Sequence, residues 1–203
     1  MLKDLVIIGA GGHARTCIDA IESTGDYRIV GLVGDVEQKG AQVFIYPVIG
    51  SDSDLEEISK KVKYAFIGVG QIYSSSARER LYNHAIKLGF KLPTIISRSA
   101  DVSRYAILGA GSLVAPGAIV NAGAFVGLNS IINTRALVEH DCRVGNHCHV
   151  STGAILNGNV SVGNRSFIGS GSVIKNGVCI GDNVFIRMSS TVIDDISTVN
   201  AMY

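Results

Sequence analysis

The 203-residue chain carries 18 Lys and Arg against 17 Asp and Glu, a net charge of +1, and 47% of its residues are hydrophobic. This length suits two modest domains, and the balanced charge gives no reason to expect nucleic-acid or anionic-membrane binding. No apolar run approaches the length of a transmembrane helix, and residues 1–11 show no cleavage-site pattern, so a cytoplasmic protein without membrane insertion is predicted.

The first predicted element is a buried strand over the β-branched, apolar residues 5–8, followed by the glycine loop 9–13. Residues 14–23 predict a helix, because their apolar residues recur on one side. A strand, a glycine loop and a helix start an α/β unit, in which the amides at the helix N-terminus can hold a phosphate. A second strand, 28–33, ends just before Asp35, whose carboxylate could accept hydrogen bonds from a ribose or a base.

The glycine loop also matches the dinucleotide fingerprint G-x-G-x-x-A with a later acidic residue. A complete dinucleotide fold has two mononucleotide halves, whereas here a different pattern begins at residue 94. A dinucleotide-binding regulatory domain is therefore a second hypothesis. In a third, the glycines only let strand and helix pack closely.

Further short elements complete the N-terminal part. Gly70 follows a strand and should reach the same sheet edge as Gly11. Arg78 either approaches a phosphate at that edge or is an ordinary solvated helix residue. No linker precedes residue 94, so two packed domains are predicted, 1–93 and 94–203. The remaining elements are expected at residues 43–46 (strand), 54–61 (helix capped by Ser53), 64–69 (strand), 76–88 (helix ended by Gly89) and 91–95 (strand).

From Thr94 to Asp195 the sequence divides into uninterrupted blocks of six residues. The third residue of each block is Ile, Leu or Val, and the first is always small or β-branched. A fixed short period is typical of a solenoid, whereas a β-sandwich would show turn signals about every 8–12 residues. We predict that each block forms one strand and one corner, and that three blocks close a triangular coil. Gly and Asn recur at the fourth position, where we expect them to supply a positive φ at the corner.

Histidines and cysteines in the repeat raise the possibility of a metal site. Cys142 and Cys148 are first residues of adjacent blocks, so buried thiols are expected rather than disulfides or metal ligands. Three histidines in a hexapeptide prism can bind zinc, as in γ-type carbonic anhydrases. However, His140, His147 and His149 fall at the fifth, sixth and second positions of their blocks and need not converge, so no metal is predicted.

His140 is the strongest candidate for catalysis from the residues alone. As the fifth residue of its block it should lie at a corner and point outward. The residues one coil away on either side, Ala122 and Gly158, are small and leave room for a substrate. A neutral imidazole can take a proton from an attacking amine or hydroxyl, and the neighbouring Asp141 can fix its tautomer. The simpler alternative is a surface corner residue.

The whole chain resembles the bacterial hexapeptide-repeat sugar acetyltransferases. This group includes UDP-4-amino-sugar N-acetyltransferases, perosamine N-acetyltransferases and sialic acid O-acetyltransferases. The resemblance implies an α/β N-terminal domain with a short parallel sheet that binds a sugar nucleotide. A left-handed parallel β-helix that binds acetyl-CoA and carries catalysis follows it. The matching stretches are residues 9–13, 34–35, 132–134, 138–142 and 145–153.

The resemblance also implies roles for individual residues and a homotrimer with acetyl-CoA between neighbouring prisms. His140 would be the catalytic base and Asp141 the acidic neighbour that raises its basicity. His149 would lie near the thioester, and the backbone of Ser170 and Met188 would lie along the coenzyme. The pocket for the nucleotide-activated amino sugar would be formed by Gly11, Gly12, His13, Asp35 and Gly70.

The activity implied is transfer of acetyl to the 4-amino group of a nucleotide-linked deoxy amino sugar, for glycan or polysaccharide assembly. O-acetylation of sialic acid is the main alternative, and a structural solenoid without chemistry is a further one. Family members usually end in a Gly-x-Pro-Ala tail that touches the coenzyme. This sequence ends instead at 200–203 with Asn-Ala-Met-Tyr, so no contacts to the adenosine end are predicted.

Overall fold

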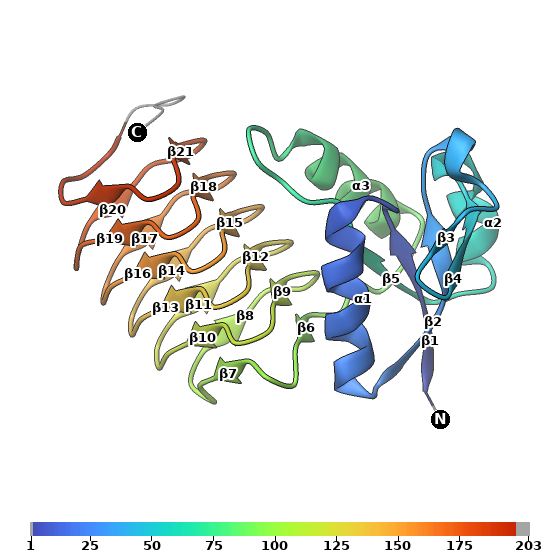
Figure 1. Cartoon of the computed structure of the whole chain (residues 1–203), viewed down its shortest axis with the longest axis horizontal. Coiled ribbons are helices and arrows are strands. Elements are labelled where there is room, and N and C mark those ends of the chain that lie inside the picture. Colours follow the sequence, from blue (N-terminus) through green and yellow to red (C-terminus); the bar gives the residue numbers. More distant parts are fainter. Residues whose placement is uncertain (1, 198–203) are drawn as a thin grey trace.

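The computed structural model describes residues 2–197, so the chain end at 200–203 lies outside the described residues. Two parts lie side by side, an α/β part and a regular prism of short strands (Figure 1). The elements of the first part are β1 (Lys3–Ile8), α1 (Gly12–Thr24), β2 (Tyr27–Val33), β3 (Gln42–Val43), β4 (Tyr46–Gly50), α2 (Leu55–Ser59), β5 (Tyr64–Ile67) and α3 (Ser76–Lys87), with 3-10 turns at Val36–Gln38 and Asp52–Asp54.

The N-terminal sheet has five strands in the order β3-β4-β2-β1-β5. All neighbours are parallel except β3 and β4, which pair antiparallel. Helix α1 covers one face of this sheet, and α2 and α3 cover the other. The carboxyl ends of the central strands therefore meet at one edge, beside the N-terminus of α1, where ligands of such sheets bind.

Most of the predicted elements are found, with differences at three places. The strand expected at 91–95 is only an isolated bridge at Lys91, followed by β6 at Ile95–Ile96. The strand expected at 43–46 is a hairpin formed by β3 and β4. The helix expected from residue 54 begins at Leu55 after a 3-10 turn. The cap before that turn is Ser51 rather than Ser53, because the backbone N–H of Ser51 donates to the Asp54 carboxylate at 2.9 Å. Gly89 follows α3 with a φ of 83°, as expected for a helix stop.

The prism consists of two-residue strands in three parallel sheets, one for each side. Partners lie eighteen residues apart, as in the pair Ile119 and Leu137, so three blocks do close one coil of a parallel β-helix. The strands β7 to β22 run from Asp101–Val102 to Thr191–Val192 at six-residue intervals, after β6 at Ile95–Ile96. The sheets are β22-β19-β16-β13-β10-β7, β20-β17-β14-β11-β8 and β21-β18-β15-β12-β9-β6.

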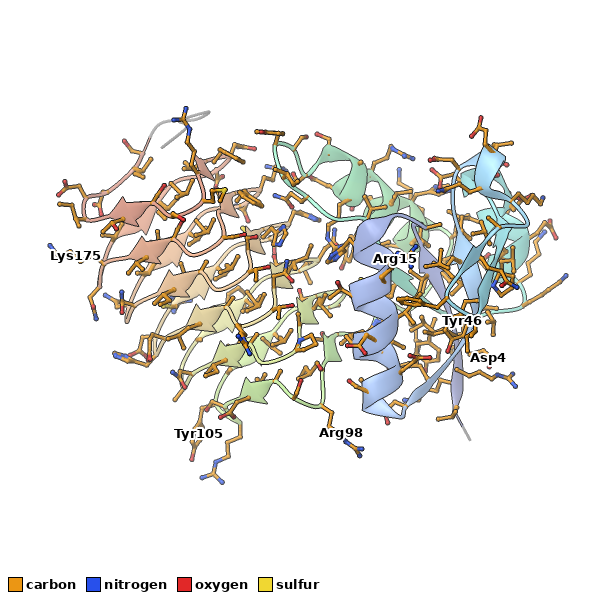
Figure 2. The ribbon with its side chains drawn as sticks, in the orientation of Figure 1. Asp4, Arg15, Tyr46, Arg98, Tyr105 and Lys175 are labelled. Carbon is orange, nitrogen blue, oxygen red and sulfur yellow. The ribbon has the colours of Figure 1, made fainter. Side chains whose placement is uncertain are left out.

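First and third residues of the blocks fill the prism core, including the thiols of Cys142 and Cys148. The role expected for the fourth position was wrong. Positive φ occurs at the sixth position, as in Asp141 with a φ of 61°. The fourth-position glycines instead allow coils to stack closely. A Cβ on Gly163 would lie 2.5 Å from the carbonyl carbon of Gly181 in the next coil. Exposed side chains such as Tyr105 and Lys175 project from the outside of the prism (Figure 2).

The two parts share a hydrophobic cluster. Ile18 and Ile21 of α1 pack with Ile95, Leu113 and Ile131, which are second residues of blocks on one prism side and are fully buried or nearly so. Helix α1 therefore lies between its own sheet and the prism (Figure 1). Within residues 2–197, no helix is long and apolar enough to cross a membrane.

Arg78 contradicts both sequence-based expectations for it. The side chain neither reaches a phosphate site nor lies in solvent, because it is completely buried between α3 and the prism. An arginine at a helix position next to polar residues gives no sequence signal of burial. Only the packing of the two domains removes it from water.

Candidate active site

His140 lies at a prism corner, after β13 (Leu137–Val138), with its side chain 60% exposed. Its Nδ1 lies 3.0 Å from Oδ2 of Asp141, and because a carboxylate only accepts, Nδ1 carries the proton. This leaves Nε2 as a free acceptor. The backbone N–H of His140 donates to the Glu139 carboxylate at 3.2 Å. The geometry therefore presents an unprotonated ring nitrogen at the surface.

The hydrogen bond to Asp141 raises the pKa of His140, and the negative charges of Asp141 and Glu139 add to this, while partial desolvation opposes it. A more basic imidazole is a better proton acceptor near neutral pH. The space expected beside His140 has a different use, because the ring itself occupies it. A Cβ on Gly158 would lie 2.6 Å from Nε2, so Gly158 accommodates the imidazole rather than a substrate.

Gly11 and Asp35 line a cavity of about 310 Å³ at the carboxyl ends of β1 and β2. Gly11 precedes α1, and Gly12 is the first helical residue, so the free amides of the helix start lie next to this cavity. Asp52 and Arg80 line its other side and form an ion pair at 3.1 Å. The cavity therefore combines anion-binding amides with carboxylates that can accept hydrogen bonds from a nucleoside.

His13 and Gly70 lie together at the domain junction. A Cβ on Gly70 would come 3.3 Å from the Cβ of His13, and the His13 and His149 rings are 6.4 Å apart. The buried Nε2 of His13 has no hydrogen-bond partner among the described residues. Burial lowers the pKa of His13 to about 3, helped by the charge of Arg78. The ring is therefore neutral at physiological pH.

His149, in β15 (His149–Val150), is buried beneath the loop that follows β5. Its Nδ1 lies 2.7 Å from the carbonyl oxygen of Gln71, and its Nε2 lies 3.0 Å from Nδ2 of Asn133. Both ring nitrogens are thus engaged. Burial lowers its pKa to about 4, so the ring is neutral at physiological pH.

Ser170 and Met188 are eighteen residues apart and lie at the same prism corner, on a groove of about 450 Å³. The groove walls include the cationic Arg187 and the stacked rings of Tyr73 and Phe185, whose centroids are 5.0 Å apart. Apolar walls with one cation fit part of an acyl-coenzyme A, which has an apolar arm and phosphates.

The corners of the prism separate the predicted catalytic and coenzyme residues within one chain. Because His140 and Ser170 differ by thirty residues, which is not a multiple of eighteen, they lie at different corners. The structure brings Gly11 together with Asp35, and His13 with Gly70 and His149, but it does not bring His140 to either group. No cluster of three or more metal-binding side chains occurs in residues 2–197.

Comparison with known proteins identifies both parts. The model of the PglD N-terminal domain matches residues 4–85, and the bacterial transferase hexapeptide model (six repeats) matches residues 159–194. No curated protein matches. The acetyltransferase domain of PglB from Neisseria gonorrhoeae is 33% identical over 96% of this chain and 93% of that chain, with a TM-score of 0.88. Another structure of that domain contains acetyl coenzyme A.

PerB from Caulobacter crescentus, in complex with CoA and GDP-perosamine, is also 33% identical. The match covers 100% of this chain and 94% of that one, with a TM-score of 0.92. The chain belongs to the bacterial hexapeptide-repeat sugar acetyltransferase family. The expected fold, the enzyme class of acetyl-CoA-dependent sugar N-acetyltransferases, and acetyl-CoA as co-substrate are thereby confirmed. WeeI from Acinetobacter baumannii, at 21% identity with a TM-score of 0.79, shares the fold.

Several residues of this acetyltransferase's site are absent from the sequence-based prediction. Gln71 and Asn133 hold His149, and Asp52 with Arg80 completes the nucleotide-sized cavity. Asn133 lies in one of the stretches that carry the family resemblance, so it could have been proposed. Gln71 lies in a loop, Asp52 in a 3-10 turn and Arg80 on α3, and no periodicity indicates that these residues converge with the site.

Proposed function

We propose that this acetyltransferase moves acetyl from acetyl-CoA to the 4-amino group of a nucleotide-linked deoxy amino sugar, with His140 as the general base. The observation that carries the proposal is the His140–Asp141 pair, which leaves Nε2 free at an exposed corner. Solved relatives that bind CoA with GDP-perosamine support an amino-sugar nucleotide as acceptor.

The chemistry assigned to His140 is proton transfer. As the sugar amine attacks the thioester carbonyl carbon and the C–N bond forms, Nε2 accepts the amine proton. The carboxylate of Asp141 stabilises the resulting imidazolium. When the C–S bond breaks, the imidazolium returns this proton to the CoA thiolate, so the base is regenerated in each turnover.

Two features support binding of the nucleotide sugar in the N-terminal cavity. The α1 amides after Gly11 would bind its diphosphate, and the carboxylate of Asp35 would accept hydrogen bonds from the nucleoside. His13, with its unpartnered Nε2, would contact the sugar end. Since acetyl-CoA and nucleotide sugars are cytoplasmic metabolites, a cytoplasmic location is part of this proposal.

A homotrimer is also part of the proposal, because one chain does not bring His140 to the other ligand groups. On the prism side that carries β10, β13, β16 and β19, the outward second residues form an apolar stripe that is only partly covered. These residues are Ile119, Leu137, Ile155 and Val173. A second prism packed on this side would bury the stripe and could join His140 of one copy with the groove at Ser170 and Met188 of its neighbour.

A thermal-shift panel with acetyl-CoA, UDP, GDP, CMP, NAD and sialic acid tests the substrate class. A ligand at 100 times its dissociation constant adds roughly 2.7 kcal/mol to the unfolding free energy, which is readily measured. Stabilisation by acetyl-CoA and one nucleoside diphosphate is expected. Stabilisation by sialic acid without a nucleotide would favour O-acetylation, and stabilisation by NAD would favour dinucleotide binding.

Replacing His140 tests the base. With a nucleotide amino sugar identified by the panel, His140→Gln should reduce kcat by roughly 10²-fold or more, because general-base catalysis contributes about that much. His84→Gln, a partly exposed histidine on α3 outside the proposed site, is the matched control. Near wild-type turnover of His140→Gln would refute the proposed role.

A further inference from the structure

Arg78 of α3 is a fully buried cation that no acidic side chain contacts in the described part of the chain. Four backbone carbonyls surround it instead. Nη1 donates to the carbonyls of Ile67 and Val69 at 2.7 and 2.8 Å, Nε donates to Asn129 at 3.1 Å, and Nη2 donates to Gly111 at 3.4 Å. A planar guanidinium can serve several acceptors at fixed angles, which an ammonium cannot.

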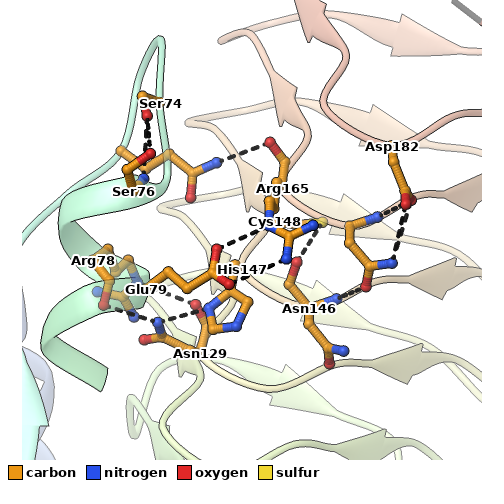
Figure 3. Close-up of polar contacts among 12 residues, drawn as sticks. Ser74, Ser76, Arg78, Glu79, Asn129, Asn146, His147, Cys148, Arg165 and Asp182 are labelled. Atoms are coloured by element: carbon orange, nitrogen blue, oxygen red, sulfur yellow. Dashed lines mark hydrogen bonds and ion pairs between the residues drawn. The ribbon is translucent and has the colours of Figure 1, made fainter. Parts of the chain in front are cut away.

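These four bonds join three segments that are distant in the sequence. Ile67 and Val69 lie at the end of β5, whereas Gly111 and Asn129 lie on successive coils of the prism. Asn129 also returns a hydrogen bond to the Arg78 carbonyl at 3.4 Å and donates to Nδ1 of His147 at 3.0 Å (Figure 3). Arg78 therefore fastens the end of β5 directly to the prism.

A second contact between α3 and the prism supports the same alignment. Glu79 accepts two hydrogen bonds from Arg165, at 2.9 and 3.1 Å (Figure 3). The backbone carbonyl of Arg165 also accepts a hydrogen bond from Nε2 of Gln71 at 3.5 Å. The loop after β5 is thus held at both its beginning and its end.

The segment fastened by Arg78 leads directly to His149. Gln71 follows Val69 by two residues, and its carbonyl oxygen lies 2.7 Å from Nδ1 of His149. Since a carbonyl only accepts, the His149 proton must be on Nδ1, and Nε2 accepts from Asn133. Neutral histidine carries its proton on Nε2 more often, so this tautomer depends on two partners, the Gln71 carbonyl at Nδ1 and the Asn133 amide at Nε2.

The charge of Arg78 acts on the same histidines. Burial, as the larger effect, and then the guanidinium lower the pKa of both His13 and His149. The other titratable groups facing this junction are Cys17 from α1, Glu79 from α3, and His147 and Arg165 from the prism.

We propose that Arg78 is a positioning residue of the acetyltransferase, which fixes the loop after β5 against the prism and thereby sets the tautomer and orientation of His149. This rests on the proposed function and on the position beside the thioester that the family resemblance implies for His149. Arg78 contacts neither substrate. It acts through Ile67, Val69 and the Gln71 carbonyl.

The test is the tautomer of His149, read from its ring ¹⁵N chemical shifts in the full-length protein. The wild type should show the Nδ1–H tautomer. Arg78→Met removes the donors at similar volume, so the Nε2–H tautomer should appear. Arg28→Met, which removes an exposed arginine of β2 that pairs with Asp4 of β1, is the matched control and should leave the spectrum unchanged.

Kinetics provide the second readout. Because displacement of a site by about 1 Å can reduce turnover about 10²-fold, Arg78→Met should lower kcat by roughly that factor. Arg78→Lys keeps the charge and its effect on the histidine pKa values but lacks the planar fork, so it should restore only part of kcat. If Arg78 had only a structural role, the variants would lower stability without these separate effects on the histidine pKa values and on kcat.

The outcomes distinguish this inference from the proposed function. An unchanged His149 tautomer and kcat in folded Arg78→Met would overturn the positioning role. If Arg78→Met does not fold, an Nε2–H tautomer in the wild type, or an unchanged His149 tautomer and kcat in folded Arg78→Lys, would overturn it equally. A wild-type protein that transfers no acetyl group would refute the proposed function, while the tautomer change would still support the role of Arg78.

Discussion

The imidazole of His140 lies against Gly158 of the next coil, at a position where any side chain would exclude it. A Cβ on Gly158 would come 2.6 Å from Nε2 and 2.7 Å from Cε1. The glycine therefore determines where the proposed base can point, although it has no chemistry of its own.

Gly158→Ala should impair catalysis without impairing the fold. The added methyl group meets the end of an exposed side chain that can rotate away, so the unfolding free energy should change little. The displaced imidazole should lower kcat by roughly 10²-fold, since proton transfer needs a hydrogen-bonded geometry. Wild-type kcat, measured with a nucleotide amino sugar, would contradict this placement of His140.

Gly163→Ala provides the opposite case. Its Cβ would meet the backbone of the next coil, 2.5 Å from the carbonyl carbon of Gly181 and 2.5 Å from the amide nitrogen of Asp182. Backbone atoms cannot move aside locally, so a loss of roughly 1–3 kcal/mol of stability is expected from overpacking. Denaturant unfolding measures it, and kcat of the folded fraction should stay close to the wild-type value.

Asp141→Asn separates charge from hydrogen bonding at the base. Asparagine tolerates the positive φ at this position and can still accept from Nδ1 of His140. The hydrogen bond to the charged Asp141 carboxylate and the attraction of that charge both raise the pKa of His140, so a neutral amide as acceptor lowers that pKa. The acid limb of the kcat/KM profile should therefore move to lower pH, and the plateau should fall roughly 10-fold as the base weakens. An unchanged acid limb would show that His140 does not cause it.

Ile155→Glu tests the proposed trimer. A carboxylate in the middle of the apolar stripe should not be tolerated between packed prisms. Light scattering should show trimers for the wild type and monomers for the variant, with an unchanged circular dichroism spectrum and lost activity. Lys63→Glu, on the surface of the N-terminal part, is the control that should remain trimeric.

Acid should destabilise the protein before its carboxylates titrate. His13 and His149 stay neutral when folded, with pKa values of about 3 and about 4, whereas unfolded histidine binds a proton near 6.5. The unfolded state thus binds more protons below that pH, so stability falls from about pH 7 to about pH 5, by on the order of 3 kcal/mol for two such groups. Urea unfolding at both pH values measures this. A constant midpoint would show that these rings are not buried as neutral groups.

The prism could be predicted almost completely from the sequence. Each block repeats the same local pattern, and coils contact only their nearest neighbours eighteen residues away, so local period and core packing give the same answer. His140 and Asp141 were predictable for the same reason, because adjacent residues at a corner interact whatever the rest of the chain does. Even here the sequence misassigned the reason for the fourth-position glycines, since close approach between coils depends on their stacking in space.

The domain junction could not be predicted. The sequence by itself determined the repeat, the glycine loop and the candidate base, all of which depend on residues near one another in the chain. Only the tertiary structure decided that Arg78 is buried and that Gln71 holds His149. These contacts join residues far apart in the sequence, and they form only when α3 and its loop pack on the prism, which no local propensity or period specifies.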